Sequence, residues 1–99
     1  MAELSTIARP YAKAAFEYAR DKGQLSQWDK ELAAVAAVSL DDTMDGVLHN
    51  PALTAEQQAQ TLNGVCGESL GAETQSFIAI LASNKRLALL PEIHSLFAQ

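Results

Sequence analysis

The stretch that decides the fold runs from Leu4 to Gly23, and its sequence is LSTIARPYAKAAFEYARDKG. Its apolar residues recur every three or four positions, which is the period of an α-helix and not of a strand. Alanine, the strongest helix former, is its commonest residue. Gly23 is suited to follow a helix end, because glycine accepts the left-handed backbone conformation there. We expect a helix from about Ser5 to Lys22, with Pro10 loosening or slightly kinking its first turns.

Five further helical segments are expected after Gly23, separated by turn-forming residues. Ser26 with Asp29 resembles a capping pair at the start of the second helix, and Thr54 with Gln57 forms a capping box at the start of the fourth. The expected segments are a helix from Gln24 or Ser26 to Ser39, a short helix between Asp42 and Asn50, and helices over 54–66, 72–83 and 87–97. No stretch alternates strictly between apolar and polar residues. The sequence therefore predicts an all-α fold, a compact six-helix bundle in a single domain over residues 1–99.

The composition excludes several classes of protein. The formal net charge is −5, whereas nucleic-acid-binding proteins are normally basic, so we expect no nucleic-acid partner. No apolar run approaches the roughly 20 residues that a membrane-spanning helix needs. The N-terminus has no cationic stretch followed by an apolar run, so we expect no signal peptide and no membrane insertion. The single cysteine, Cys66, excludes an intramolecular disulfide.

No pattern in the sequence is typical of an active site. His49 and His94 lie far apart, without a cysteine or carboxylate at metal-ligand spacing, so solvated surface histidines are the better interpretation. Cys66 ends an apolar helical stretch and is expected to be a buried small hydrophobe. The aspartates at 41, 42 and 45 do not follow the spacing of a calcium loop and are expected at a helix N-terminus. The sequence therefore predicts no catalytic residue, no metal and no cofactor.

The first and fifth helices carry more apolar surface than one buried face requires. On a helical projection, the apolar arc of the first helix spans about 200°, against the roughly 100° of a one-sided amphipathic helix. Two interpretations stand equally from the pattern. In the first interpretation, both helices are central and buried on most sides. In the second, they lie side by side and leave a shallow apolar groove open to a partner helix. In the second case Tyr11, Tyr18 and Ile80 supply contact area, and Ala14, Ala15, Ser76 and Ala79 let the partner approach closely.

The segment from Ala8 to Phe16, ARPYAKAAF, resembles the opening of a known family, the delta subunit of bacterial F-type ATP synthase, whose mitochondrial counterpart is the oligomycin-sensitivity-conferring protein. The segment from Asn84 to Ile93, NKRLALLPEI, resembles the Asn-x-Arg-Leu…Leu-Pro pattern of the same family. The stretch VCGE at residues 65–68 lies between them at a fitting distance. The resemblance covers essentially the whole chain.

The resemblance implies a six-helix N-terminal domain of a longer delta subunit, which binds the N-terminal helix of one alpha subunit on its first and fifth helices. The contact positions it implies are Tyr11, Ala14, Ala15, Tyr18, Ser76, Ala79, Ile80 and Ser83. The family's C-terminal part, which joins the b-subunit stalk, is absent from these 99 residues.

The function that the resemblance implies is that of a non-catalytic stator component. It holds the alpha/beta hexamer against rotor torque, as a peripheral part of the complex at the cytoplasmic face of the bacterial inner membrane. In isolation the chain is expected to be a monomer. The alternatives are another helical adaptor that binds an amphipathic helix, a small helical enzyme or ligand carrier, and a homodimer that uses the same apolar patch.

Overall fold

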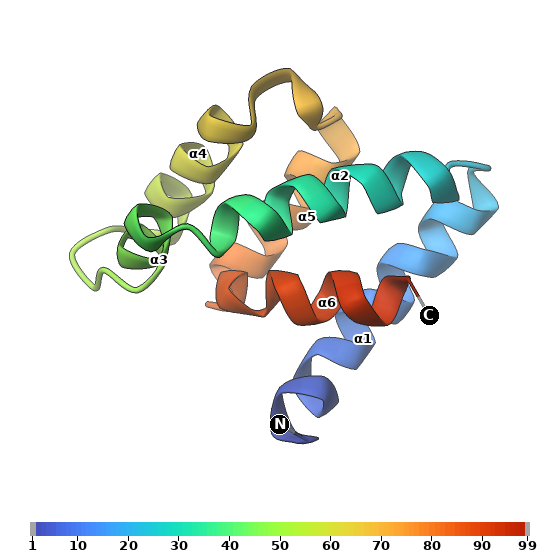
Figure 1. Cartoon of the computed structure of the whole chain (residues 1–99), viewed down its shortest axis with the longest axis horizontal. Helices are drawn as coiled ribbons and strands as arrows, with labels where there is room; N and C mark the ends of the chain where they lie inside the picture. Colours follow the sequence, from blue (N-terminus) through green and yellow to red (C-terminus); the bar gives the residue numbers. More distant parts are fainter. Residues whose placement is uncertain (1, 99) are drawn as a thin grey trace.

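In the computed structural model, which describes residues 2–98, six α-helices follow one another along the chain (Figure 1). The helices are α1 Ala2–Asp21, α2 Leu25–Ser39, α3 Asp42–Leu48, α4 Ala55–Cys66, α5 Ala72–Ser83 and α6 Leu90–Phe97, with 3₁₀ turns η1 Gly67–Ser69 and η2 Leu87–Leu89. The described residues contain no strand. The predicted all-α fold of six helices is confirmed.

The turn after α1 forms as its sequence predicts. Gly23 adopts a positive φ of 67°. Its amide donates to the carbonyl of Arg20 at 3.1 Å, and the amide of Gln24 donates to the carbonyl of Ala19 at 2.8 Å. These two bonds satisfy carbonyls at the helix end in the Schellman arrangement. The helix begins earlier than predicted, at Ala2, and continues through Pro10.

The predicted capping pair of Ser26 and Asp29 is wrong. The helix α2 begins at Leu25, and Gln24 is the residue that precedes it, without a side-chain cap. The amide of Trp28 already donates to the carbonyl of Gln24 at 2.9 Å. Because the Schellman turn reverses the chain within two residues, the next helix starts at once and Ser26 lies inside it.

The starts of α3 and α4 follow the predicted chemistry. The carboxylate of Asp41 accepts hydrogen bonds from the amides of Thr43 and Met44 at the start of α3. Thr54 and Gln57 form the complete capping box of α4, with bonds of 2.9 and 3.1 Å. Side-chain oxygens thus satisfy amides that have no partner within the helix.

The core lies where α2 and α6 run in opposite directions between the other helices (Figure 1). Leu32 and Val35 of α2 and Leu90 and Ile93 of α6 are fully buried. The first helix packs mainly on α6. The buried stripe of α1 consists of alanines that are each at most 4% exposed, namely Ala8, Ala12, Ala15 and Ala19. Short side chains on one stripe let the two helices approach closely.

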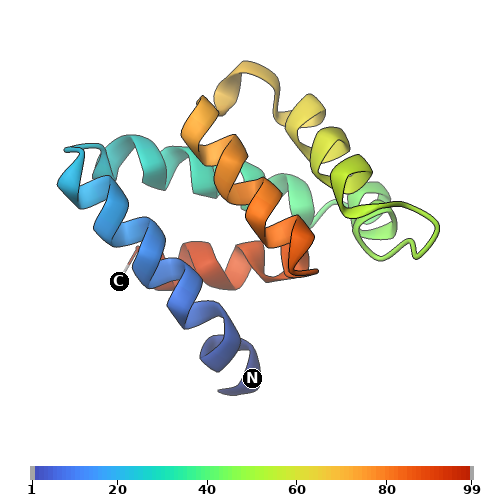
Figure 2. The same cartoon turned by 180° about the vertical axis from the view of Figure 1, so that it is seen from behind.

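The broad apolar arc of α1 is divided between the core and the surface. Its alanine stripe is buried, but Leu4, Ile7 and Tyr18 on the neighbouring stripe are 47%, 36% and 37% exposed. The fifth helix is divided in the same way, with Ile78 buried and Ile80 53% exposed. Figure 2 shows these two helices on the same face of the molecule, running in opposite directions in front of α2 and α6.

Candidate functional site

An apolar hollow of about 270 Å³ lies between α1 and α5. We call it the α1–α5 groove. Its lining residues are Ala14, Ala15 and Tyr18 of α1, Trp28 of α2, and Glu73, Ser76, Phe77 and Ile80 of α5. Two helix faces that the sequence singled out separately therefore contribute to one surface feature.

The floor of the groove is an aromatic cluster. The ring of Trp28 meets the ring of Tyr18 edge to face at 5.7 Å between centroids, and that of Phe77 at 5.8 Å. Trp28 is only 4% exposed, so it belongs to the core and forms the bottom of the groove. Because aromatic pairs of this kind have preferred geometries, they hold the two walls at a set separation.

A hydrogen bond joins the two walls. The hydroxyl of Tyr18 donates to a carboxylate oxygen of Glu73 at 2.7 Å. This bond raises the pKa of Tyr18 above its ordinary value of 10.0, with smaller contributions from desolvation and from the negative charge of Glu73. The ammonium of Lys22 lies 5.7 Å from the centroid of the Tyr18 ring. Apart from this polar contact, the lining is almost wholly apolar.

A buried carboxylate fixes the start of α5. Glu31 of α2 is 6% exposed, and it accepts hydrogen bonds of 2.8 Å from the backbone amide of Gly71 and from the side chain of Gln27. Gly71 precedes α5 and provides no side-chain cap of its own, so a different helix supplies the acceptor. Desolvation raises the pKa of Glu31, but hydrogen bonds from Gly71, Thr74 and Gln27 outweigh it and lower the pKa below its ordinary value.

The structure brings five of the eight predicted docking residues to the groove. These are Ala14, Ala15, Tyr18, Ser76 and Ile80. Of the five, Ala15 is 3% exposed, so it offers little surface. The hydroxyl of Ser76 donates to the carbonyl of Ala72 at 3.1 Å. That bond turns the polar atom back onto its own helix and leaves the wall of the groove apolar.

The other three predicted residues lie outside the lining. Tyr11 is half-buried and packs against the core. Ala79 and Ser83 are exposed on α5, and the hydroxyl of Ser83 donates to the carbonyl of Ile80 at 3.0 Å.

Three lining residues were missed by the sequence analysis, namely Trp28, Glu73 and Phe77. Phe77 belongs to the apolar excess of its helix, and its position three residues before Ile80 is a usable signal. No local pattern indicates that Trp28 of α2 would reach between the two walls.

The remaining candidate residues have structural partners. His49 lies 2.9 Å from the carbonyl oxygen of Asp45, and His94 of α6 lies 3.2 Å from a carboxylate oxygen of Asp29 of α2. Cys66 is buried as predicted, and burial raises the pKa of its thiol. Among the described residues, no three side chains of the His, Cys, Asp or Glu type are grouped to hold a metal ion. No helix among them is both long and apolar enough to cross a bilayer.

Comparison with known proteins shows which sequences this chain resembles. Residues 7–99 match the family model described as ATP synthase delta (OSCP) subunit. The chain is 56% identical to the ATP synthase subunit delta of Hahella chejuensis (strain KCTC 2396) and 52% identical to that of Cellvibrio japonicus (strain Ueda107), in each case over all 99 residues. These residues cover 56% of the length of either relative. The chain thus spans about half the length of the curated relatives it matches.

Proposed function

The chain belongs to the ATP synthase delta (OSCP) subunit family, and on that premise we propose that its α1–α5 groove binds the N-terminal helix of an alpha subunit. The chain then acts as a non-catalytic stator component of the F-type ATP synthase. Residues 1–99 form the N-terminal domain of a longer delta subunit, whose C-terminal part joins the b-subunit stalk. The assembly lies at the cytoplasmic face of the inner membrane, with this chain as a peripheral member.

The observation that carries the proposal is the apolar groove between two antiparallel helices. An amphipathic helix that lies in a hydrophobic groove is a recurrent mode of recognition, in which its apolar face replaces water on both walls. Ala14 and Ser76 present short side chains on opposite walls, whereas Tyr18 and Ile80 are large and about 37% and 53% exposed. Small residues let the partner backbone approach, and the large ones supply the buried area.

The proposed mechanism is mechanical. Rotation of the central shaft exerts torque on the alpha/beta hexamer, and the stator must hold the hexamer still. The joint must therefore dissociate slowly. Affinity differences between related complexes arise mostly in the dissociation rate, and a groove whose walls are already held by ring contacts and a hydrogen bond loses little entropy on binding.

The test is an amide NMR titration of the 99-residue chain with a peptide that copies the N-terminal segment of the matching alpha subunit. The largest shift changes are expected at Ala14, Tyr18, Ser76 and Ile80. The fluorescence of Trp28, the only tryptophan of the sequence, should change over the same concentration range. A peptide of the same composition in scrambled order is the control, since it lacks the apolar face.

Other outcomes of the titration contradict the proposal in different ways. Saturable binding with shift changes elsewhere supports the alpha-subunit helix as the partner but rejects the groove as its binding site. The absence of binding rejects the alpha-subunit helix as the partner and favours a helical adaptor for a different helix.

A further inference from the structure

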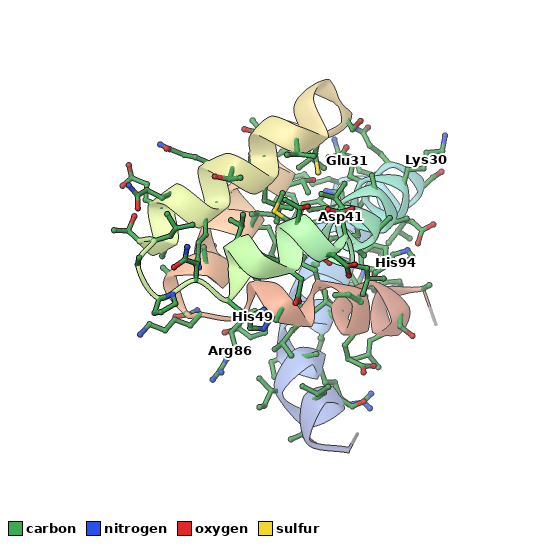
Figure 3. The ribbon with its side chains drawn as sticks, turned by 60° about the vertical axis from the view of Figure 1, so that its left-hand side comes forward. Lys30, Glu31, Asp41, His49, Arg86 and His94 are labelled. Atoms are coloured by element: carbon green, nitrogen blue, oxygen red, sulfur yellow. The ribbon has the colours of Figure 1, made fainter. Side chains whose placement is uncertain are left out.

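The charges of this chain are distributed very unevenly. Residues 31–84 contain seven aspartates and glutamates and no lysine or arginine. Of these acidic residues, Glu31 and Glu73 make the contacts around α5 described above. Asp41, Asp42 and Asp45 lie at the start of α3. Figure 3 turns this end of the molecule forward, with Asp41 labelled. A partner that approaches the start of α3 therefore meets three carboxylates, whereas Lys85 lies with His49 beyond the C-terminal end of α3.

The same end of the molecule carries a second apolar hollow, of about 500 Å³. We call it the acidic hollow. Its lining residues are Ala37, Val38, Asp41, Thr43, Met44 and Val65. Val65 of α4 is 60% exposed, and Leu40, which follows α2 in the chain, is 68% exposed. They are the most exposed large apolar side chains among the described residues. Val65 lines the hollow, and an exposed apolar side chain at a hollow marks an interaction surface more often than an isolated one does.

We propose that the acidic hollow is a second docking surface, for a basic amphipathic segment of another polypeptide. An apolar side chain of that segment packs against Val38 and Val65, and its lysines or arginines face Asp42 and Asp45, the second of which lies 3.2 Å from the ring of His49. The carboxylate of Asp42 has no hydrogen-bonding or ionic partner among the described residues. Charge complementarity of this kind selects the partner and speeds the encounter.

The two docking surfaces are separate. The α1–α5 groove lies over Trp28, near the N-terminal end of α2, whereas the acidic hollow begins at Ala37, near its C-terminal end. The views from both sides show α1 and α3 at opposite ends of the molecule (Figures 1 and 2). The chain can therefore hold one partner in the groove and another in the acidic hollow at the same time, in a ternary complex.

A second copy of this chain fits the acidic hollow less well. On a helical projection of α1, Arg9, Lys13 and Arg20 share one exposed face. That face carries no exposed large apolar side chain, so it could neutralise the aspartates but would leave Val65 and Leu40 in water. We therefore assign the surface to a different polypeptide that has both basic and apolar residues.

The test uses three synthetic helical peptides of equal length, each titrated into the 99-residue chain by amide NMR. The first carries leucines on one face and lysines on the other, the second replaces the lysines with glutamates, and the third replaces the leucines with serines. The leucine–lysine peptide is expected to shift the amides of Val38, Met44 and Val65 and to bind at least about tenfold more tightly than either control. Its affinity at these residues should decrease as the salt concentration is raised from 50 to 300 mM.

Two pairs of variants locate the contact. Val65→Ser should weaken the leucine–lysine peptide at the acidic hollow about tenfold, because the side chain loses its apolar burial. Ile80→Ser, which changes a similarly exposed apolar residue of the groove, should leave the affinity at the acidic hollow unchanged. Asp42→Asn should weaken it about threefold, and Glu17→Gln on α1, which removes one negative charge elsewhere, should not.

Several results overturn the proposal. These are shift changes confined to the groove, equal binding of the leucine–glutamate peptide, or an affinity that Val65→Ser does not change. Sedimentation of the chain without peptide tests the second copy. If the chain alone forms a dimer and Val65→Ser dissociates that dimer, the occupant of the acidic hollow is a second copy of the chain and not a different polypeptide.

Discussion

The α1–α5 groove and the acidic hollow are both apolar depressions, but they are built in different ways. The walls of the groove are long helices, joined by the Tyr18–Glu73 hydrogen bond and by ring contacts through Trp28. The acidic hollow is lined by the end of α2, by Asp41, by the seven-residue helix α3 and by one residue of α4, with no aromatic side chain. A surface held in its binding shape loses less entropy on association. We therefore expect a tight complex at the groove and a weaker, salt-dependent one at the acidic hollow.

The largest expected effect comes from placing the same charge in both depressions. Ala14→Asp puts a carboxylate in the groove, where the alpha-subunit helix would bury it without a partner, at a cost of roughly 3 kcal/mol. The affinity for the alpha-subunit peptide should fall about 100-fold, measured by the fluorescence of Trp28 or by calorimetry. Ala14 is exposed in the free chain, so the fold should be unaffected.

The matched control is Ala37→Asp, which changes an exposed alanine of α2 at the acidic hollow. The affinity for the alpha-subunit peptide should stay within about twofold of the unmodified chain. Circular dichroism and urea unfolding test whether both variants fold. Near-normal binding by a folded Ala14→Asp variant rejects the groove as the docking site. An equal loss in both variants means that overall charge, and not the groove, controls binding.

The second prediction concerns the rigidity of the groove. Glu31→Ala removes the carboxylate that accepts from Gly71 and Gln27 and leaves the amide that precedes α5 without an acceptor. We expect a loss of about 2–3 kcal/mol in the free energy of unfolding, measured with urea. Gln27→Ala, which removes only one donor, should cost less than about 1 kcal/mol. Equal losses in the two variants would show that the contact between Glu31 and the start of α5 adds nothing to the free energy of unfolding.

A third, smaller effect follows from titrating Glu31 without removing it. Its pKa is lowered in the folded chain, from an ordinary value of 4.5. The stability it contributes is therefore fully present above the ordinary pKa and is lost as the pH falls through the lowered folded pKa. The loss should be smaller than that of Glu31→Ala, because a protonated carboxyl still accepts through one oxygen. Urea unfolding between pH 7 and pH 3 measures it.

Glu31→Gln serves as the control for this pH dependence, because it cannot titrate. Its unfolding free energy should fall less steeply below pH 4.5 than that of the unmodified chain. An identical acid profile for the two proteins would assign the pH dependence to other carboxylates.

The fold was largely predictable from the sequence because its helix ends depend on local chemistry. Gly23 and the Thr54–Gln57 capping box act within a few residues, so their effects can be inferred from the sequence. The capping role of Ser26 was wrong because its prediction omitted how quickly the preceding turn reverses the chain. Glu31 gave no signal, because its partner Gly71 lies 40 positions away.

The two depressions also differ in whether the local sequence reveals them. Excess apolar surface on one helix is visible as a periodicity, so Ala14, Tyr18 and Ile80 could be selected in advance. The acidic hollow brings together Val38 and Val65 from different helices. Each is unremarkable within its own segment, so only the tertiary fold reveals the surface.

The smallest expected effect separates the hydrogen bond across the groove from its aromatic floor. Tyr18→Phe keeps the ring that contacts Trp28 but removes the hydroxyl that donates to Glu73. Because this hydrogen bond is solvent-exposed, the affinity for the alpha-subunit peptide should fall only about twofold. Tyr11→Phe is the control, since no hydrogen bond of the Tyr11 hydroxyl is found among the described residues, and it should change nothing. A loss of tenfold or more in Tyr18→Phe would show that the hydrogen bond, and not ring packing, sets the width of the groove, and the preorganisation that distinguishes it from the acidic hollow would then depend on one exposed contact.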